Sequence, residues 1–360
     1  MSRLAKLVSI VGISALSLAL SGCSFFISDA QSRPDGNQNA DAVSVLRLGY
    51  FANLTHAPAL VAVERGLFET KLKPLGIALE PTVFNAGPDA VTALLAGSLD
   101  IAYLGPNPTI NAYTVSNGSA VRVIAGSTSG GAALVVSKDI TQISQLAGKT
   151  LATPQLGNTQ DVALRYFLKT HGLSTDKTGS GDVSILPQSN AEGLSAFLLG
   201  HTAGAWVPEP WVSAYVKAGA QVLVNESDLW PNHEFINTNV VVRSEFLQKY
   251  PAVVAAFLAA HLDSLDFIAK QPAQAQKIVA DKIGEVTGSK QDSSVIASAW
   301  KNVAFGFDPL AKTLAVSADH AVAVGLLAPQ LVKDVGGFGD LYNLDLLNAE
   351  LRSRNLKPVD

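Results

Sequence analysis

DAVTALLAGSLDIAYL, residues 89–104, contains the pattern that decides the fold: an apolar helix, a glycine that ends it, and a short buried strand. Asp89 to Ala96 has apolar residues at helical spacing, Gly97 follows, and Asp100 to Leu104 is typical of a buried strand. EGLSAFLLGHTAGAWV, residues 192–207, repeats this order at an offset of 103 residues. The matched pairs are Ala93 and Ala196, Leu95 and Leu198, Gly97 and Gly200, Ala102 and Ala205, and Tyr103 and Trp206. Either two such units resemble each other by chance, or the chain contains two lobes of equivalent construction.

Strands and helices alternate on both sides of these two stretches. The predicted strands are Val45 to Tyr50, Ile77 to Phe84, Val121 to Ala125, Ala132 to Val136, Gly148 to Thr153, Val183 to Leu186, Ala203 to Val207 and Asn239 to Arg243. The predicted helices are Pro58 to Phe68, one starting near Pro108, Thr159 to His171, Ala191 to Leu199, Tyr250 to Ala269, Pro272 to Ile283, Ser293 to Asn302 and Leu310 to Leu327. Strands separated by helices predict βαβ units and a mainly parallel sheet. The late helices are expected to pack back on the first lobe.

The composition excludes several classes of protein. The 360 residues include one cysteine and one methionine, both within the first 23 positions, so disulfide scaffolds and thiolate metal sites are excluded. Hydrophobic residues make up 48% and charged residues 16%, which indicates a globular protein. The net charge of −4 gives no electrostatic footprint for a nucleic acid. We therefore expect no nucleic-acid partner, no metal and no cofactor.

The amino terminus has the layout of an export signal. Arg3 and Lys6 precede an apolar run from Leu7 to Leu20, which is too short for a comfortable membrane span. Leu20-Ser21-Gly22-Cys23 resembles the bacterial lipobox, in which the cysteine is lipidated. An ordinary secretory signal with a chance cysteine and an uncleaved anchor are the two alternatives. The prediction is a lipoprotein signal peptide over residues 1–22, lipidation at Cys23 and a flexible tether over residues 23–43.

Motifs for catalysis are missing from the sequence. Gly148-Lys149-Thr150 lacks the earlier glycine of a phosphate-binding P-loop, because Ile143 occupies that position. Residues 126–130, GSTSG, have threonine where a nucleophile elbow requires serine. No two of the six histidines are four residues apart, which is the spacing that a zinc-binding helix requires. The sequence therefore predicts a protein that is not an enzyme.

Four loops place glycine and small polar residues directly before a helix. They are Thr55 to Pro58, Asn85 to Asp89, Gly105 to Thr109 and Gly157 to Asp161. Free N–H groups at helix N-termini bind anions, and open α/β sheets bind ligands at the carboxyl ends of their strands. Each loop alone is better explained as a helix cap, but their recurrence favours an anion site. The aromatic residues beside the loops either line this site or belong to the core: Tyr50, Phe51, Tyr103, Trp206 and Trp211.

The loops together resemble the nitrate/sulfonate/taurine family of ABC-transporter substrate-binding proteins, and most closely its aliphatic-sulfonate-binding branch. The resemblance spans roughly residues 46–265 and rests on these segments: Leu48 to Tyr50, Thr55 to Leu60, Asn85 to Asp89, Ala93 to Asp100, Tyr103 to Pro108, Gly148 to Asp161 and Gly204 to Trp211. It implies an α/β, two-lobed type II periplasmic-binding-protein fold with a hinge and an interlobe ligand cleft. Lobe 1 is then expected to comprise residues 44–129 and 238–360, and lobe 2 residues 130–237.

The resemblance also implies a set of ligand-binding residues. They are Asn53, Thr55, His56, Gly87, Gly105, Pro106, Asn107, Ser127, Thr128, Ser129, Asn158, Thr159, Gln160, Asp161, Trp206 and Glu209. Glu209 is either a capping or surface acid or a group that faces the cleft, where it would select a ligand with an amine or hydroxyl. These motifs contain no arginine, so an anion would be held by hydroxyls and backbone N–H groups.

The implied function is that of a monomeric, extracytoplasmic solute-binding lipoprotein, held at the cell membrane by its lipid. It would deliver a small organic anion, with aliphatic sulfonate or taurine as the first expectation, to an ABC permease and its ATPase. Two alternatives use the same scaffold. One is a binding protein for nitrate, phosphonate or a pyrimidine, and the other is an enzyme similar to a thiamine-pyrimidine synthase or a chorismate dehydratase.

Overall fold

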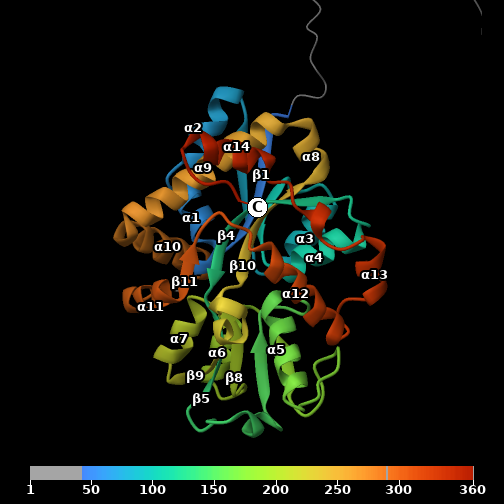
Figure 1. Ribbon diagram of the computed structural model, residues 1–360. Helices are drawn as coiled ribbons and strands as arrows, with labels where there is room; N and C mark the ends of the chain where they lie inside the picture. The colour runs from blue at the N-terminus through green and yellow to red at the C-terminus, as the bar shows by residue number, and fades with distance from the viewer. Residues whose placement is uncertain (1–42, 289–290, 360) are drawn as a thin grey trace, which may run out of the picture. The chain divides into compact units, whose positions relative to one another are not determined.

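Two mixed β-sheets organise residues 43–288 and 291–359, which the computed structural model describes (Figure 1). The predicted signal peptide, Cys23 and the tether up to residue 42 lie outside the described residues. The first sheet has the strand order β11-β4-β10-β3-β1-β2. Its strands are β1 (Val45–Phe51), β2 (Ala78–Phe84), β3 (Ile101–Leu104), β4 (Val121–Gly130), β10 (Ile236–Arg243) and β11 (Val303–Phe305).

The second sheet has the strand order β7-β6-β8-β5-β9. Its strands are β5 (Ala132–Ser137), β6 (Thr150–Thr153), β7 (Ser184–Pro187), β8 (Gly204–Pro208) and β9 (Ala220–Asn225). The parallel trio β2-β1-β3 of the first sheet recurs here as β7-β6-β8. The repeat at residues 89–104 and 192–207 therefore reflects two equivalent βα units, one in each sheet.

The prediction of a mainly parallel sheet is wrong. In the first sheet β10 runs antiparallel to both β3 and β4, and in the second sheet β5 runs antiparallel to both β8 and β9. The physical reason is that β4 passes directly into β5 through Gly130 and Gly131, and the chain returns to the first sheet as β10. These connections between sheets carry no crossover helix, so they do not impose the parallel direction of a βαβ unit.

Fourteen helices, counted within the described residues, cover the sheets (Figure 1). Those associated with the second sheet are α5 (Thr159–Thr170), α6 (Asn190–Leu198) and α7 (Trp211–Lys217). The others are α1 (Ala57–Glu64), α2 (Leu67–Leu72), α3 (Gly87–Leu95), α4 (Pro106–Val115), α8 (Ser244–Lys249), α9 (Pro251–Lys270), α10 (Pro272–Thr287), α11 (Ser293–Ala299), α12 (Ala311–Ala323), α13 (Pro329–Asp334) and α14 (Asp345–Ser353). The single helix predicted from Pro58 to Phe68 is instead two, because Gly66 adopts a left-handed conformation with φ of 63°.

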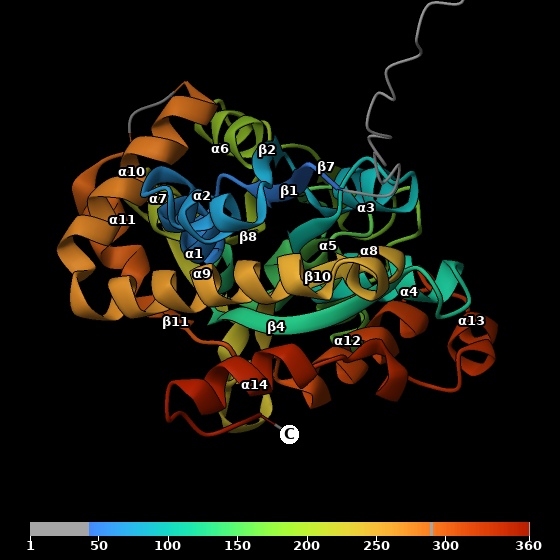
Figure 2. The same ribbon diagram turned by 90° about the horizontal axis from the view of Figure 1, so that it is seen from above.

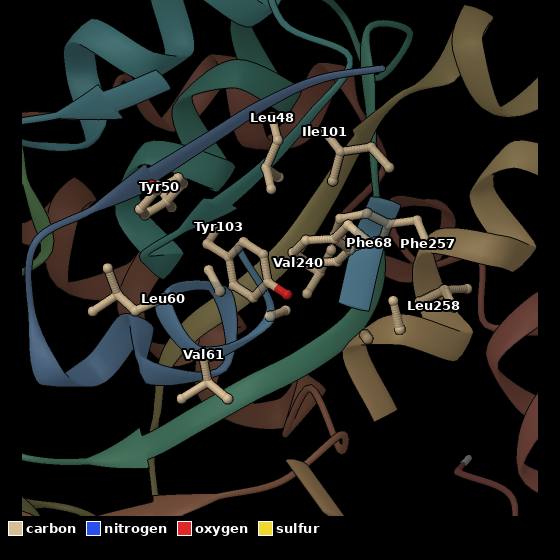
Figure 3. Close-up of a cluster of buried hydrophobic side chains, with 14 of the residues drawn as sticks. Leu48, Tyr50, Leu60, Val61, Phe68, Ile101, Tyr103, Val240, Phe257 and Leu258 are labelled. Atoms are coloured by element: carbon tan, nitrogen blue, oxygen red, sulfur yellow. The ribbon is translucent and has the colours of Figure 1, made fainter. Parts of the chain in front are cut away.

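The largest core lies between the first sheet and helices α1, α2 and α9 (Figure 3). Leu48 and Tyr50 of β1 and Leu60 and Val61 of α1 point into this cluster, and Tyr103 lies among them. Phe68 of α2 stacks on Phe257 of α9 at 4.6 Å between ring centroids. This packing fixes one face of the sheet whose strand ends carry the candidate site.

Helix α9 is long and apolar enough to cross a membrane by length and composition alone. More than half of its most apolar window, 56%, is buried against the rest of the protein. Figure 2 shows α9 running alongside α1, and its buried face contributes Val254, Phe257 and Leu258 to the core. These contacts are typical of the central helix of a globular protein.

Candidate functional site

Three helices begin at one place, although they come from different parts of the chain. Gly87 is the first residue of α3, Pro106 of α4 and Thr159 of α5. A Cβ added to Gly87 would lie 2.2 Å from Cγ of Pro108 and 3.1 Å from Oδ1 of Asn158, the residue that precedes α5. The structure therefore brings the predicted Gly87, Gly105–Asn107 and Asn158–Thr159 loops together.

Gly105 lets α4 and α5 approach each other closely. A Cβ at Gly105 would lie 2.4 Å from Oγ1 of Thr159 and 3.5 Å from the carbonyl oxygen of Asn237. The hydroxyl of Thr159 is buried and has no hydrogen-bond partner among the described residues. The amide of Asn107 donates to the carbonyl of Ser317 in α12 at 3.0 Å. The start of α5 therefore carries a buried hydroxyl that lacks a hydrogen-bond partner, close to the start of α4.

Glu209 lies at a second group of predicted residues, where the two sheets meet. Its carboxylate is fully buried and accepts hydrogen bonds from Ser213 N at 3.0 Å, from Ser213 Oγ at 3.0 Å and from Nδ2 of Asn302 at 2.7 Å. Burial raises the pKa of Glu209, and these hydrogen bonds oppose the rise. The alternative of a surface acid is therefore wrong, and the carboxylate caps the first turn of α7 while it contacts Asn302 beyond the second sheet.

The loop after β1 completes this second group. Oδ1 of Asn53 accepts a hydrogen bond from Nε1 of Trp211 at 2.8 Å, and the backbone N–H of Leu54 donates to the carbonyl of Glu209 at 3.0 Å. The hydroxyl of Thr128 donates to the carbonyl of Thr55 at 2.7 Å. These contacts connect the loop after β1 to strand β4 and to the start of α7.

His56 is buried in the same loop and carries no charge. Its Nδ1 accepts from the backbone N–H of Phe51 at 3.3 Å, and its ring lies 4.3 Å from that of Phe51. Burial lowers the pKa of His56 from 6.5 to about 3. His56 therefore shapes the loop as a neutral side chain and offers no cation to an anionic ligand at neutral pH.

Three polar residues of β10 link the two groups, and the sequence reasoning missed all of them. Nδ2 of Asn237 donates to the carbonyl of Gly130 at 2.7 Å, while its own carbonyl lies beside Gly105. Thr238 Oγ1, both amide atoms of Asn239, and Oγ of Ser127 on the neighbouring β4 are buried without a hydrogen-bond partner in the described part of the chain. The sequence does contain a signal for these residues, because Asn237-Thr238-Asn239 interrupts an otherwise apolar strand.

Two predicted site residues make their contacts elsewhere. Trp206 packs against Phe167 and donates from Nε1 to Glu226 at 2.6 Å, in a separate cavity. The carboxylate of Asp161 accepts from Thr153 Oγ1, Gly157 N and Nε of Arg165, at 3.0, 2.9 and 2.9 Å. Asp161 therefore holds the loop before α5 in place, and its ion pair with Arg165 is buried.

The remaining predicted residues lie on the same loops. Pro106 stands in the first turn of α4, Gln160 accepts a hydrogen bond from Asn158, and Ser129 pairs with β10 and β11 at the end of β4. The polar side chains of the predicted set other than Ser129 are between 0 and 7% exposed. No cluster of three metal-ligating side chains occurs among the residues that the structure describes. The arrangement thus brings buried hydroxyls, amides and one carboxylate together at the starts of the helices.

Residues 39–283, more than half of the chain, match the sequence model of the NMT1-like family. The chain belongs to the NMT1-like family. This NMT1-like protein is 28% identical over 264 residues to a binding protein of Brucella abortus (strain 2308), with 71% of this chain and 78% of that protein covered. It is 29% identical over 216 residues to the taurine-binding periplasmic protein of Escherichia coli (strain K12), with coverage of 58% and 62%.

A solved structure confirms the predicted fold of this NMT1-like protein. The alkanesulfonate-binding protein of Xanthomonas axonopodis pv. citri, bound to MOPS, superposes with a TM-score of 0.67 at 21% identity, covering 82% of this chain and 98% of that one. The likeness supports the type II periplasmic-binding fold, because at this identity it concerns the fold alone. The relatives are named as binding proteins and not as enzymes, which confirms the prediction that this chain is not an enzyme.

Proposed function

We propose that this NMT1-like protein is an extracytoplasmic binding protein that captures a small organic anion and delivers it to an ABC permease and its ATPase. The observation that carries the proposal is the meeting of the N-termini of α3, α4 and α5 at Gly87, Gly105 and Thr159. Each N-terminus presents the positive end of a helix dipole, and α3 and α5 also present free N–H groups. Several such ends around one point bind an anion without a cationic side chain.

Buried groups without partners indicate how the anion is held. The hydroxyls of Ser127, Thr159 and Thr238 and the amide of Asn239 are ready to donate hydrogen bonds. A buried polar group without a partner costs roughly 1–3 kcal/mol, so a bound oxyanion that satisfies these groups recovers that energy. The Gly87, Gly105 and Asn158 loops, Asn53, Thr55, His56 and residues 127–129 surround this ligand in the proposal. Asp161 supports the site by holding the loop before α5 in place.

Aliphatic sulfonates and taurine are the proposed ligands. Three tetrahedrally placed oxygens suit a set of hydroxyl and N–H donors that includes no arginine. The taurine-binding and alkanesulfonate-binding proteins to which this chain is similar support the choice. Glu209 would favour taurine over other aliphatic sulfonates. Its carboxylate would attract the ammonium group of taurine and repel a ligand with a second negative charge.

Residues 44–129 and 238–360 would form the lobe around the first sheet, and residues 130–237 the lobe around the second. In the closed arrangement the predicted ligand contacts are almost wholly buried, so a ligand enters only when the lobes separate. Gly130 and Gly131, both at φ of 71°, are the proposed hinge. Cys23 would hold the protein at the membrane by a lipid, and replacement of Cys23 by serine should abolish incorporation of a labelled fatty acid.

Isothermal titration calorimetry of residues 24–360 tests the ligand. Taurine, ethanesulfonate, nitrate, methylphosphonate and a hydroxymethyl pyrimidine are titrated in parallel, and turnover is followed by mass spectrometry. We expect saturable binding of taurine or ethanesulfonate without turnover. Binding of nitrate, phosphonate or the pyrimidine alone would replace the sulfonate proposal, and a chemical product would favour the enzyme alternative.

A pair of matched variants tests the site itself. Thr159→Val removes the unpartnered hydroxyl at the start of α5, whereas Thr170→Val removes an exposed hydroxyl at the end of the same helix. We expect Thr159→Val to weaken ligand binding about tenfold, the effect of one lost hydrogen bond, and Thr170→Val to leave it unchanged. Equal affinities of the two variants would show that the ligand binds elsewhere.

A further inference from the structure

A second cavity lies apart from the proposed anion site, beside α5 and α12. Its volume is about 230 Å³. Aromatic and histidine rings form most of its wall, with one carboxylate among them: Tyr166, Phe167, Trp206, Trp230, His320 and Glu226. Tyr166 and Phe167 come from α5, and His320 comes from α12. None of the residues that line this cavity is a lysine or an arginine.

The carboxylate of Glu226 is held by two indole rings. Its Oε2 accepts a hydrogen bond from Nε1 of Trp206 at 2.6 Å, and the indole of Trp230 also donates to it. Only 2% of Glu226 is exposed, and burial raises its pKa to about 7. The two indole N–H groups fix the position of the carboxylate, but they are neutral and do not balance its charge once it ionises.

The rings around this carboxylate are held rigidly against one another. His320 stacks on Tyr166 with 3.7 Å between centroids and an interplanar angle of 15°, and it lies 5.6 Å from Trp230. Phe167 lies 5.5 Å from Trp206. Burial lowers the pKa of His320, so this ring stays neutral where Glu226 is ionised. The cavity therefore combines a negative charge with aromatic surfaces and no compensating cationic side chain.

We infer that this cavity binds a small organic ammonium ion, with its positive charge against Glu226 and its alkyl groups against Tyr166, Trp230 and Phe167. Aromatic rings attract cations through their quadrupole, and quaternary ammonium groups suit such surroundings because they need no hydrogen-bond acceptors. An anion would be repelled by Glu226. A metal ion would find only one carboxylate and no cluster of ligands among the described residues. A cavity of this volume admits an ion of the size of tetramethylammonium or choline.

Tetramethylammonium chloride is the probe for this site. It is titrated into residues 24–360 at pH 8, where Glu226 is ionised, and tryptophan fluorescence and thermal unfolding are recorded. His171, His320 and Tyr166 are the other titratable groups around the cavity, and burial lowers the pKa of His320. We expect a saturable signal with tetramethylammonium and choline, and none with sodium chloride at the same ionic strength or with the uncharged 3,3-dimethylbutanol.

Three variants decide the outcome. Glu226→Gln keeps an acceptor for the indoles and removes the charge, and Tyr166→Leu removes an aromatic wall at a half-buried position. Both should weaken tetramethylammonium binding at least about tenfold, whereas Glu234→Gln, an exposed acid eight residues further on, should not. Retained affinity in Glu226→Gln, or in Tyr166→Leu if the first variant does not fold, would overturn the inference. So would equal binding of the uncharged alcohol or the absence of saturation by 100 mM.

The inference does not depend on the proposed sulfonate site. Taurine and ethanesulfonate titrations of Glu226→Gln and Tyr166→Leu measure that site separately. A loss of tetramethylammonium binding with unchanged sulfonate binding would establish two independent sites.

Discussion

Single glycines determine how closely the helices of the anion site approach each other. Gly105 has φ of −69°, a value open to any residue, so its lack of a side chain serves the contact with Thr159 and not the backbone conformation. Gly87 fills the same role against Pro108. Ordinary helix-cap reasoning finds these glycines but assigns them to the turn, because the neighbour that requires each of them lies on another helix.

Gly105→Ala is expected to weaken ligand binding with little effect on folding of the separate lobes. The added methyl would lie 2.4 Å from Oγ1 of Thr159 and would hold α4 and α5 apart. Overpacking of this kind costs roughly 1–3 kcal/mol, which corresponds to a ten- to hundredfold loss of affinity. Calorimetry measures this loss. Gly339→Ala, where nothing lies within 4 Å of the new methyl, is the control and should bind as the wild type does.

Buried histidines should make the protein less stable as the pH falls. Burial lowers the pKa of His56 to about 3 and that of His261 to about 4, so between pH 6.5 and 5 the unfolded chain takes up two protons that the folded chain does not. Each such proton lowers the free energy of unfolding by about 1.4 kcal/mol per pH unit. Glu226, with its pKa raised to about 7, acts in the opposite direction because only the folded chain protonates it in this range.

The lowered pKa of His320 adds to the loss, and the raised pKa of Glu209 opposes it. The net expectation is a loss of stability as the pH falls from 6.5 to 5, measured by urea unfolding. Nε2 of His261 donates to the carbonyl of Gly126 at 3.0 Å, and Nδ1 of the neutral ring accepts from Tyr103 Oη at 2.8 Å. His261→Gln removes one titrating group, so the variant should lose stability less steeply, by roughly 1.4 kcal/mol per pH unit, whatever its absolute stability. An unchanged slope in this variant would show that His261 does not titrate between the folded and unfolded states.

Helix α5 shows how one element is fixed before it can bind anything. Asp161, in its first turn, receives hydrogen bonds from β6 through Thr153, from the preceding loop through Gly157 and from Arg165 one turn later. In their buried ion pair, the guanidinium of Arg165 compensates the negative charge of Asp161. The N-terminus of α5 thus keeps its positive end for a ligand even though an acidic residue stands within it.

Asp161→Asn is expected to destabilise the protein by about 3 kcal/mol, because Arg165 would remain buried without its counter-charge. Chemical unfolding measures the change. Asp266→Asn, which breaks an exposed ion pair with Lys270 on α9, serves as the control and should cause no measurable loss. If both variants unfolded at the same denaturant concentration, the Asp161–Arg165 pair would not contribute to stability.

At the level of elements, helix–glycine–strand units were predictable and the contacts between distant elements were not. The pattern at residues 89–104 found α3 and β3, and its repeat found α6 and β8. The strands β9 and β11 escaped, since one is half-exposed and the other has three residues. The family resemblance implied that Trp206 belongs to the site, but its indole donates to Glu226 in a separate cavity. The contact of Asn302 with the site could not be predicted from the sequence, because its partner, Glu209, lies 93 residues earlier.

At the level of the whole molecule, the closed arrangement depends on contacts that cross between the two sheets. Gln155 donates to Asp89 at 3.1 Å, Asn302 donates to Glu209, and Lys217 pairs with Asp292. Tyr166 and His320 stack across the same boundary. Val162 of α5 adds an apolar contact, because it packs into a core cluster of the first sheet. Separation of the proposed lobes would therefore break both polar and apolar contacts.

Gly131→Ala should impair closure specifically. Gly131 has φ of 71°, and a Cβ there would lie 2.5 Å from Cγ2 of Val303. Gly148→Ala is the matched control, since Gly148 has φ of 73° and nothing lies within 4 Å of its added methyl. Both variants carry similar backbone strain of about 1 kcal/mol. Only Gly131→Ala is expected to bind ligand more weakly and to show a larger radius of gyration by X-ray scattering at saturating ligand. Identical behaviour of the two variants would contradict a hinge at Gly131.

The fluorescence of Trp211 should report separation of the proposed lobes, because its indole donates a hydrogen bond to Asn53. When the lobes part, the indole loses a partner and meets water, so its emission should shift to longer wavelength. The chain from residue 24 onward also contains no cysteine or methionine, so a single engineered thiol could be dye-labelled there without competing sulfur groups. With the proposed closure on a ligand, one dye at a chosen position would turn this protein into a reagentless biosensor.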